Sequence, residues 1–183
     1  MMADALIPLI AVGLAELGDK TQLSILLLSS KTTKHLHLLL GVFLAFLTVD
    51  GIAVLVGSCI TTIVPLSFVK IASGIAFIVF GALTLKAGET KAESKLYSKN
   101  SFISGFMFVF MMEWGDKTQI ASALFAARYD PLMVLVGTMT ALTLMSVVAI
   151  YLGKLISSRI DSRLMTRVAG IAFLVIGVSF FLL

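Results

Sequence analysis

Charged side chains are scarce in this sequence. Only 13% of its 183 residues are Asp, Glu, Lys or Arg, and 59% are hydrophobic, whereas an average soluble domain is about 25% charged. A globular chain of this size cannot hide so much apolar surface from water. The composition therefore excludes an ordinary soluble domain. Several apolar runs reach the roughly 20 residues that a helix needs to cross a bilayer, which indicates a membrane protein.

Other absences narrow the function. The single cysteine, Cys59, excludes a disulfide within the chain. The only histidines, His35 and His37, lie away from the acidic motifs described below, so no His/Cys metal centre is expected. No Gly-rich phosphate-binding loop is present, so the chain itself gives no sign of ATP use. The net charge of +4 comes from cations in loops between apolar runs, which predicts control of membrane topology and no binding of nucleic acid.

The apolar runs predict an all-α membrane protein with six transmembrane helices. The expected spans are about 5–29, 38–64, 68–85, 102–127, 132–155 and 168–183.

The two halves of the chain repeat each other. The sequence Glu-Leu-Gly-Asp-Lys-Thr-Gln at 16–22 returns as Glu-Trp-Gly-Asp-Lys-Thr-Gln at 113–119, 97 residues later. Small residues of the other spans return at an offset of 96 and predict close helix contacts. They include Gly41 and Gly137, Gly57 and Gly153, Gly81 and Gly177, and the Gly-Ile-Ala-Phe segments at 74–77 and 170–173.

This repetition predicts the domain organisation. We expect one integrated transmembrane domain with a first three-helix repeat at 1–88, a cytoplasmic linker at 89–100 and a second three-helix repeat at 101–183. Because three is odd, the second repeat enters the membrane from the opposite side. This is the inverted-repeat plan of many secondary transporters.

Loop charges predict the orientation. Cytoplasmic loops are enriched in Lys and Arg, and one face of the predicted topology carries nearly all of these residues. Both termini should then lie on the non-cytoplasmic side of the cell membrane. The rich face has Lys31, Lys34, Lys86, Lys91, Lys95, Lys99, Lys154, Arg159, Arg163 and Arg167, and the other has Lys70 and Arg128.

Ionisable residues inside the predicted spans are the candidates for function. Each costs at least about 2.5–3.5 kcal/mol at the centre of a membrane helix, so it needs a partner, water or a bound ion. In an inverted pair, both motifs reach the midplane and can face each other. These residues are Glu16, Asp19, Asp50, Glu113 and Asp116, together with Lys20 and Lys117.

The spacing within each motif gives two structural expectations. Glu16, Asp19 and Gln22 recur at every third residue, which places them on one stripe of a continuous helix. Gly18 and its counterpart Gly115 weaken a helix, and a local break would free backbone carbonyls to act as ligands.

The ligand chemistry favours hard divalent cations. The carboxylates are joined by the amides of Gln22 and Gln119 and the hydroxyls of Thr21 and Thr118, all of them oxygen donors. Such sites suit Ca²⁺, Mg²⁺ and Mn²⁺. Buried carboxylates also take up protons when no cation is bound. The same groups can therefore exchange a metal ion for protons, and both are transported ions rather than resident cofactors.

Three further residues keep open roles. Lys20 and Lys117 would repel a cation if they pointed into the site, and we expect them to pair with the acids when it is empty. Asp50 has no acidic counterpart because Ser146 occupies the aligned position. It is equally well interpreted as a proton-path or accessory residue and as a single satisfied polar group.

The doubled motif resembles a family signature. Glu-x-Gly-Asp-(Lys/Arg)-(Thr/Ser), once in each half of a six-span protein, is similar to the GDT-one family of calcium/manganese cation:proton antiporters. The resemblance covers essentially the whole chain. It implies a transporter, not an enzyme, that exports Mn²⁺ or Ca²⁺ from the cytosol in exchange for protons. By this analogy the ion is bound by Glu16, Asp19, Glu113 and Asp116, with Thr21, Gln22, Thr118 and Gln119 adjoining.

Alternative functions stay open at this point. A passive divalent-cation channel would use the same acids without proton coupling. An exporter of amino acids, an intramembrane aspartyl hydrolase using Asp19 and Asp116, and a salt-bridged scaffold are further readings. The sequence does not decide between Mn²⁺ and Ca²⁺, or whether the protein forms a homo-oligomer.

Overall fold

The protein is helical throughout the part that the structure describes. This computed structural model describes residues 2–17, 19–86, 100–152 and 162–182, and those ranges contain helices and short connections but no strand. Almost all of the predicted linker at 89–100 lies outside them. The helices are α1 (Met2–Glu16), α2 (Lys20–Ser30), α3 (His35–Ile63), α4 (Leu66–Lys86), α5 (Ser101–Glu113), α6 (Lys117–Ala126), α7 (Pro131–Val147), the π-helical turn η1 (Val148–Leu152) and α9 (Ser162–Leu182).

The sequence marks several of the helix ends. Asn100 accepts a hydrogen bond from the backbone N–H of Phe102 at the start of α5, at 3.0 Å. Asp130 does the same for Met133 of α7 at 2.9 Å, with Pro131 in the first turn, where its missing N–H costs nothing. Helix α3 ends before Pro65, because a residue that precedes proline disfavours the helical conformation.

Two helices are long and apolar enough to cross a membrane. They run over His35–Ile60 and Pro131–Tyr151, and shorter apolar stretches of the described residues run over Thr21–Ser30, Ser67–Leu83 and Ser101–Glu113. The first and fourth predicted spans are each divided into two helices, α1 and α2 in one case and α5 and α6 in the other. The arrangement of six spans therefore stays a prediction.

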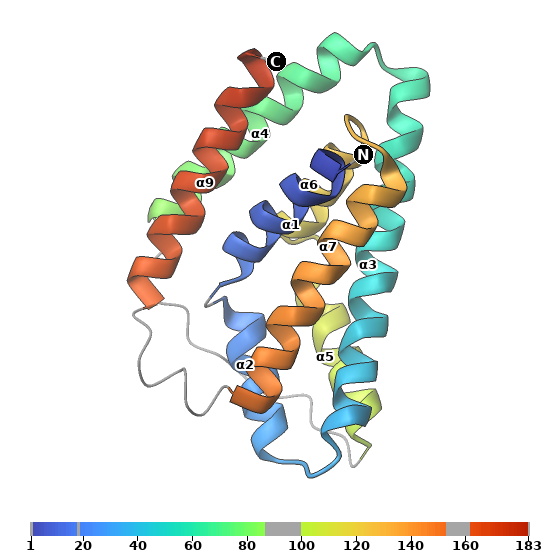
Figure 1. Ribbon diagram of the computed structural model, residues 1–183, viewed down its shortest axis with the longest axis vertical. Helices are drawn as coiled ribbons and strands as arrows, with labels where there is room; N and C mark the ends of the chain where they lie inside the picture. Colours follow the sequence, from blue (N-terminus) through green and yellow to red (C-terminus); the bar gives the residue numbers. More distant parts are fainter. Residues whose placement is uncertain (1, 18, 87–99, 153–161, 183) are drawn as a thin grey trace.

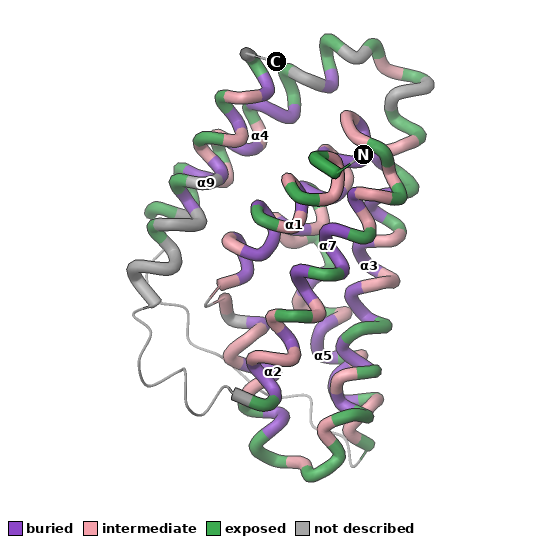
Figure 2. Tube along the Cα trace, viewed as in Figure 1, coloured by how far each residue is buried: buried purple, intermediate pink, exposed green. Residues whose placement is uncertain are grey.

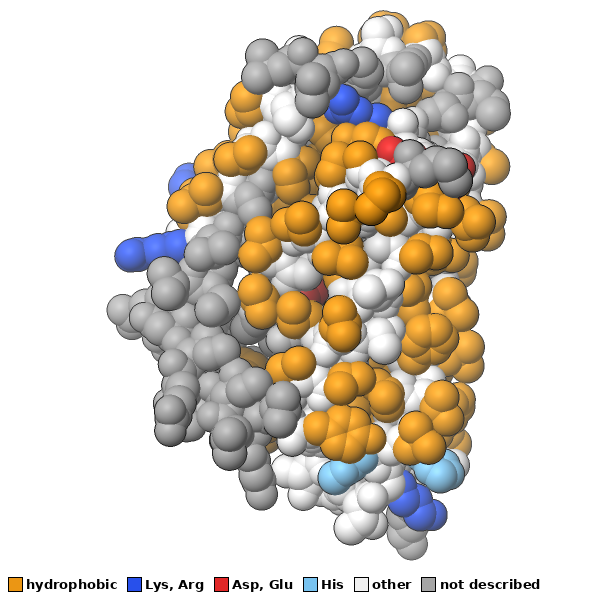
Figure 3. Space-filling view, viewed as in Figure 1, with side chains coloured by type: hydrophobic (Ala, Val, Ile, Leu, Met, Phe, Trp, Pro, Cys, Tyr) orange, Lys and Arg blue, Asp and Glu red, His pale blue; other side chains and the backbone are white. Residues whose placement is uncertain are grey.

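The outer surface is apolar. On the face shown in Figure 3, hydrophobic side chains cover most of the middle of the molecule, and the histidines lie at its lower end. Leu55 and Phe68 are each 67% exposed. Buried positions follow the inner sides of the helices (Figure 2). A surface with so many outward-facing apolar side chains is suited to contact with lipid and not with water.

The closest helix pairs join one half of the chain to the other. Helix α4 packs along α9, α3 along α5 and α6, and α1 along α7, and the α4–α9 pair forms one flank of the molecule in Figure 1. The halves are therefore interleaved, and neither buries its own helix faces without the other.

Glycines permit the closest of these approaches. A Cβ on Gly41 of α3 would lie 2.2 Å from the carbonyl oxygen of Phe102, and one on Gly137 of α7 would lie 2.1 Å from that of Ala5. These two crossings correspond under the repeat, since Gly41 aligns with Gly137 and Ala5 with Phe102. The prediction that the shared glycines mark close helix contacts is confirmed for these two; Gly153, the counterpart of Gly57, lies outside the described residues.

At the α4–α9 crossing, too, aligned glycines of the two halves make corresponding close approaches. A Cβ on Gly81 would lie 2.8 Å from the Gly170 carbonyl oxygen, and one on Gly177 would lie 2.9 Å from that of Gly74. The aligned rings of Phe77 and Phe173 meet at the same crossing, with centroids 5.8 Å apart.

Helix α3 offers a matched test of this packing. In Gly57→Ala, the new methyl group would lie 2.1 Å from the backbone oxygen of Ala123, so we expect a loss of about 1–3 kcal/mol from overpacking. Gly51→Ala meets nothing within 4 Å and should leave stability unchanged or raise it by up to about 1 kcal/mol through helix propensity. Thermal unfolding in detergent measures both, and equal midpoints would show that the crossing is not tight.

Candidate cation site

Both motifs lie across a break between two helices. Helix α1 ends at Glu16 and α2 begins at Lys20, while α5 ends at Glu113 and α6 begins at Lys117. The turns match: the N–H of Asp19 donates to the Glu16 carbonyl, and the N–H of Asp116 to the Glu113 carbonyl, both at 3.1 Å. The predicted break is therefore present. The predicted stripe was wrong, because no continuous helix runs from residue 16 to residue 22.

Gly115 makes the second break. Its φ is +81°, a conformation that glycine adopts at little cost and other residues rarely adopt. Its N–H donates to Oε1 of Gln119 at 2.7 Å, and Nε2 of Gln119 donates to the Val49 carbonyl of α3 at 3.4 Å. Gln119 thus ties the break to a neighbouring helix. Gly18, the counterpart of Gly115, lies outside the described residues.

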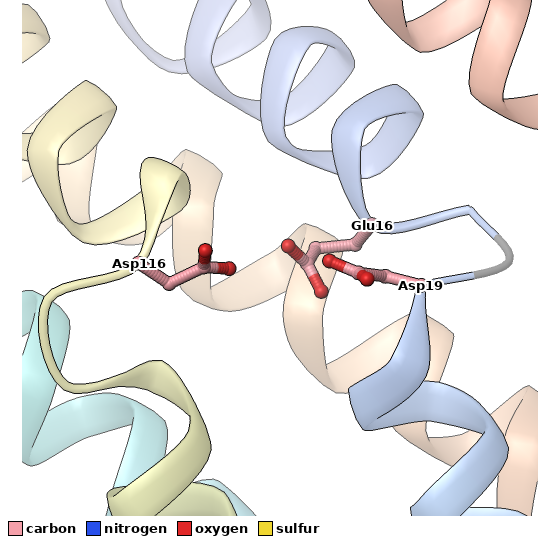
Figure 4. A group of neighbouring side chains, drawn as sticks. All are labelled: Glu16, Asp19 and Asp116. Carbon is pink, nitrogen blue, oxygen red and sulfur yellow. The ribbon is translucent and has the colours of Figure 1, made fainter. Parts of the chain in front are cut away.

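The breaks bring acids from the two halves together. Figure 4 shows Glu16, Asp19 and Asp116 pointing toward one another, the first two from one motif and the third from the other. One carboxylate oxygen from each lies within 4.8 Å of the others. Oxygens that bind one Ca²⁺ at 2.3–2.6 Å are at most about 5 Å apart. Three ligands of a single divalent cation thus fit this spacing.

The three acids differ in burial. Glu16 is 1% exposed, whereas the side chains of Asp19 and Asp116 are 12% and 22% exposed. Oε1 of Glu16 and Oδ2 of Asp116 are buried and accept no hydrogen bond from the described residues. A buried carboxylate oxygen without a donor is costly, and a bound cation would remove that cost.

Lys117 crosses between the halves. Its Nζ donates a hydrogen bond to Oδ2 of Asp19 and lies 3.9 Å from Oδ2 of Asp116. The ammonium therefore stands between two of the three acids. The side chain of Lys20, its counterpart, lies outside the described residues.

The structure leaves Glu113 out of the group of three. Glu113 is 1% exposed, and its Oε2 accepts a hydrogen bond from the Thr118 hydroxyl at 3.2 Å. Its Oε1 accepts none from the described residues. Thr21 is buried close to Glu113, and Nε2 of Gln22 is a buried donor without an acceptor in the described part of the chain. These residues lie at the same two helix breaks as the three acids.

Asp50 has a partner that sequence reasoning missed. Asp50 of α3 is 2% exposed, and its Oδ1 accepts a hydrogen bond from the Ser122 hydroxyl of α6 at 2.7 Å. Ser122 lies about one helical turn after Gln119 in the apolar helix α6. A polar residue at that position was the sequence signal from which a partner for Asp50 could have been predicted. Ser146, aligned with Asp50, donates instead to the Leu142 carbonyl of its own helix at 2.7 Å. The two halves therefore differ here.

The helix ends add a favourable field. Helices α2 and α6 begin directly after Asp19 and Asp116. A helix N-terminus carries a partial positive charge from its unpaired N–H groups, which stabilises nearby carboxylates. Broken helices with their ends at a midplane site are a feature of many secondary transporters.

Comparison with known proteins gives a consistent answer. A family model described as "Divalent cation/proton antiporter GDT1" matches residues 4–92 and 101–182. A Vibrio cholerae protein named "Putative manganese exporter" is 30% identical over 181 residues, covering 98% of this chain and 90% of that protein. A GDT1-like protein of Synechocystis is 27% identical over 187 residues, covering 90% of each. No solved structure matches.

The apolar surface and the converging acids at the two helix breaks agree with the class that the family model describes, a membrane transporter for divalent cations. The match over both halves shows that this chain belongs to the GDT1 family of divalent cation/proton antiporters.

The conformation of Gly115 gives a test of the site's geometry. Nothing lies within 4 Å of a Cβ placed there, so substitution is opposed by the backbone conformation and not by crowding. Gly115→Ala should lower the unfolding free energy by about 1–2 kcal/mol, and Gly115→Asn by less, since asparagine tolerates positive φ. Thermal unfolding midpoints should fall in the order glycine, asparagine, alanine; an alanine variant as stable as the glycine protein would contradict this φ.

Proposed function

We propose that the chain is a secondary transporter that exports Mn²⁺ or Ca²⁺ from the cytosol in exchange for protons. Glu16, Asp19 and Asp116 are the primary ligands, and Glu113 completes the site when a cation enters. The observation that carries this proposal is the convergence of three carboxylates from both halves at two helix breaks. The family description and the name of the Vibrio relative support the same cargo and exchange.

The exchange follows from the ligand chemistry. In the cytosol-facing state, the carboxylates release protons and hold a divalent cation, whose charge offsets theirs. On the proton-rich outer side, the carboxylates take up protons and lose their attraction for the metal. Movement of one repeat against the other changes which side reaches the site. Metal and protons thus occupy the same oxygens in turn.

We propose that the chain carries out this exchange as two inverted three-helix repeats, at 1–88 and 101–183. The glycine crossings support it, because α3 meets α5 as α7 meets α1, and α4 meets α9 in both directions. The gap between the two segments matched by the family model falls at the expected linker, 89–100. In Figure 1, the start of α1 and the end of α9 lie toward the same end of the molecule, which supports placing both termini on one side of the membrane. The Lys and Arg distribution of the loops is the reason to propose that this is the non-cytoplasmic side of the cell membrane.

Neutralising the acids tests the site. In proteoliposomes containing the wild type, an Mn²⁺ or Ca²⁺ gradient should drive opposite proton movement. Glu16→Gln, Asp19→Asn and Asp116→Asn should each reduce it by about 100-fold or more, because lost outer-shell partners alone cost 10–100-fold in metal affinity. Metal flux and internal pH are recorded together with fluorescent indicators.

The matched control is Asp130→Asn. It makes the same chemical change outside the site, and asparagine also caps a helix, so transport should be normal. Metal entry without proton movement would contradict the antiporter proposal and favour a passive channel. Full transport by Glu16→Gln or Asp116→Asn would remove these acids from the site.

The orientation can be tested by cysteine labelling in a Cys59→Ser background. Thr33 lies just before α3 and Ser67 lies in the first turn of α4, beyond the other end of α3, and both are exposed. A membrane-impermeant maleimide applied to intact cells should label Ser67→Cys and leave Thr33→Cys unlabelled until the membrane is opened. The reverse pattern would invert the proposed topology.

A further inference from the structure

The ammonium of Lys117 occupies the region where the proposed cargo would bind. Its Nζ donates to Asp19 and lies 3.9 Å from Oδ2 of Asp116. These are two of the three acids whose oxygens lie within 4.8 Å of one another. Glu16 is the third acid of this group, with an oxygen within 4.8 Å of oxygens of both Asp19 and Asp116. Lys117 thus pairs with two of the three carboxylates.

A metal ion and this ammonium cannot share the carboxylates at full strength. Two positive charges about 4 Å apart repel strongly in a partly buried site, where water screens them less than in bulk. The side chain of Lys117 is 20% exposed, so it has room to leave on one side. A metal that binds Asp19 and Asp116 must therefore push the ammonium away from Asp19.

We propose that Lys117 is a built-in competitor of the transported cation: its ammonium takes the place of the metal between Asp19 and Asp116 and is displaced when the metal binds. This inference rests on the proposed function, because it assumes that the cargo binds to these acids. It adds that, in the metal-free protein, the Lys117 ammonium keeps the carboxylates of the site together.

The competitor has two consequences for transport. It offsets the repulsion among the acids when no cargo is present, so the metal-free protein keeps its site assembled. It also weakens metal binding, since the metal must break an ion pair before it coordinates. Weaker binding favours release, and a transporter must release its cargo on every cycle.

A different role for Lys117 predicts the opposite result. If Lys117 only positioned Asp19 as a ligand, its removal would misplace that carboxylate and weaken metal binding. If Lys117 competes with the metal, its removal strengthens binding. The sign of the change in affinity therefore separates the two roles.

The experiment is Mn²⁺ binding to the purified full-length protein in detergent, with free Mn²⁺ followed by electron paramagnetic resonance. Lys117→Gln should bind Mn²⁺ about tenfold more tightly than the wild type or better, and Lys117→Arg, which keeps the charge, should bind about as weakly as the wild type. In liposomes, Lys117→Gln should show a lower KM and a lower maximal rate. Unchanged or weaker binding by Lys117→Gln would overturn the inference.

A measurement on the wild type covers the case in which Lys117→Gln does not fold. Saturating Mn²⁺ should increase acetylation of Lys117 by a water-soluble reagent several-fold, because the displaced amine becomes accessible; the exposed Lys34 is the internal reference. Unchanged or reduced acetylation would overturn the inference.

Glu16→Gln separates this failure from failure of the proposed function. If the wild type binds Mn²⁺ and Glu16→Gln does not, the site stands and the Lys117 results decide the inference alone. If Glu16→Gln binds as well as the wild type, the proposed site falls and the inference with it.

Discussion

Keeping carboxylates inside an apolar molecule is the constraint on which this structure depends. Glu16 and Glu113 are each 1% exposed, and an ionised group in such surroundings needs compensation. A continuous helix uses nearly all its own N–H groups internally and has none to offer. Breaking the helix at each motif supplies a helix N-terminus directly after Asp19 and Asp116. It also brings Lys117 to Asp19 and Thr118 to Glu113.

The interleaving of the halves follows from the same requirement. A site shared by two motifs needs the breaks to face each other, and the helices around them pack across the repeats, α3 on α5 and α1 on α7. Glycines at these crossings let the backbones of the two halves approach closely. This close packing fixes the position of the helix break in one motif relative to the break in the other. The contacts that hold the fold together therefore also set the distances between the acids.

The sequence anticipated the features that lie within one repeat or are common to both. The glycine crossings and the helix breaks follow from small residues at aligned positions. Spacing alone misled where the backbone departs from a helix, so the stripe of Glu16, Asp19 and Gln22 does not form. The side-chain partners within the site were also hidden: neither the bond from Ser122 to Asp50 nor the place of Glu113 outside the group of three can be derived by aligning one repeat with the other.

The pairing of helices across the halves bears on how the chain is made. Helices α1, α3 and α4 are synthesised first, yet their partners α7, α5 and α9 all come later in the chain. Until the second half enters the membrane, the glycine faces of the first half have only lipid against them, and Glu16 and Asp19 lack the neighbours supplied by the second motif. The main helix contacts of the first half can therefore form only after the second half has been synthesised.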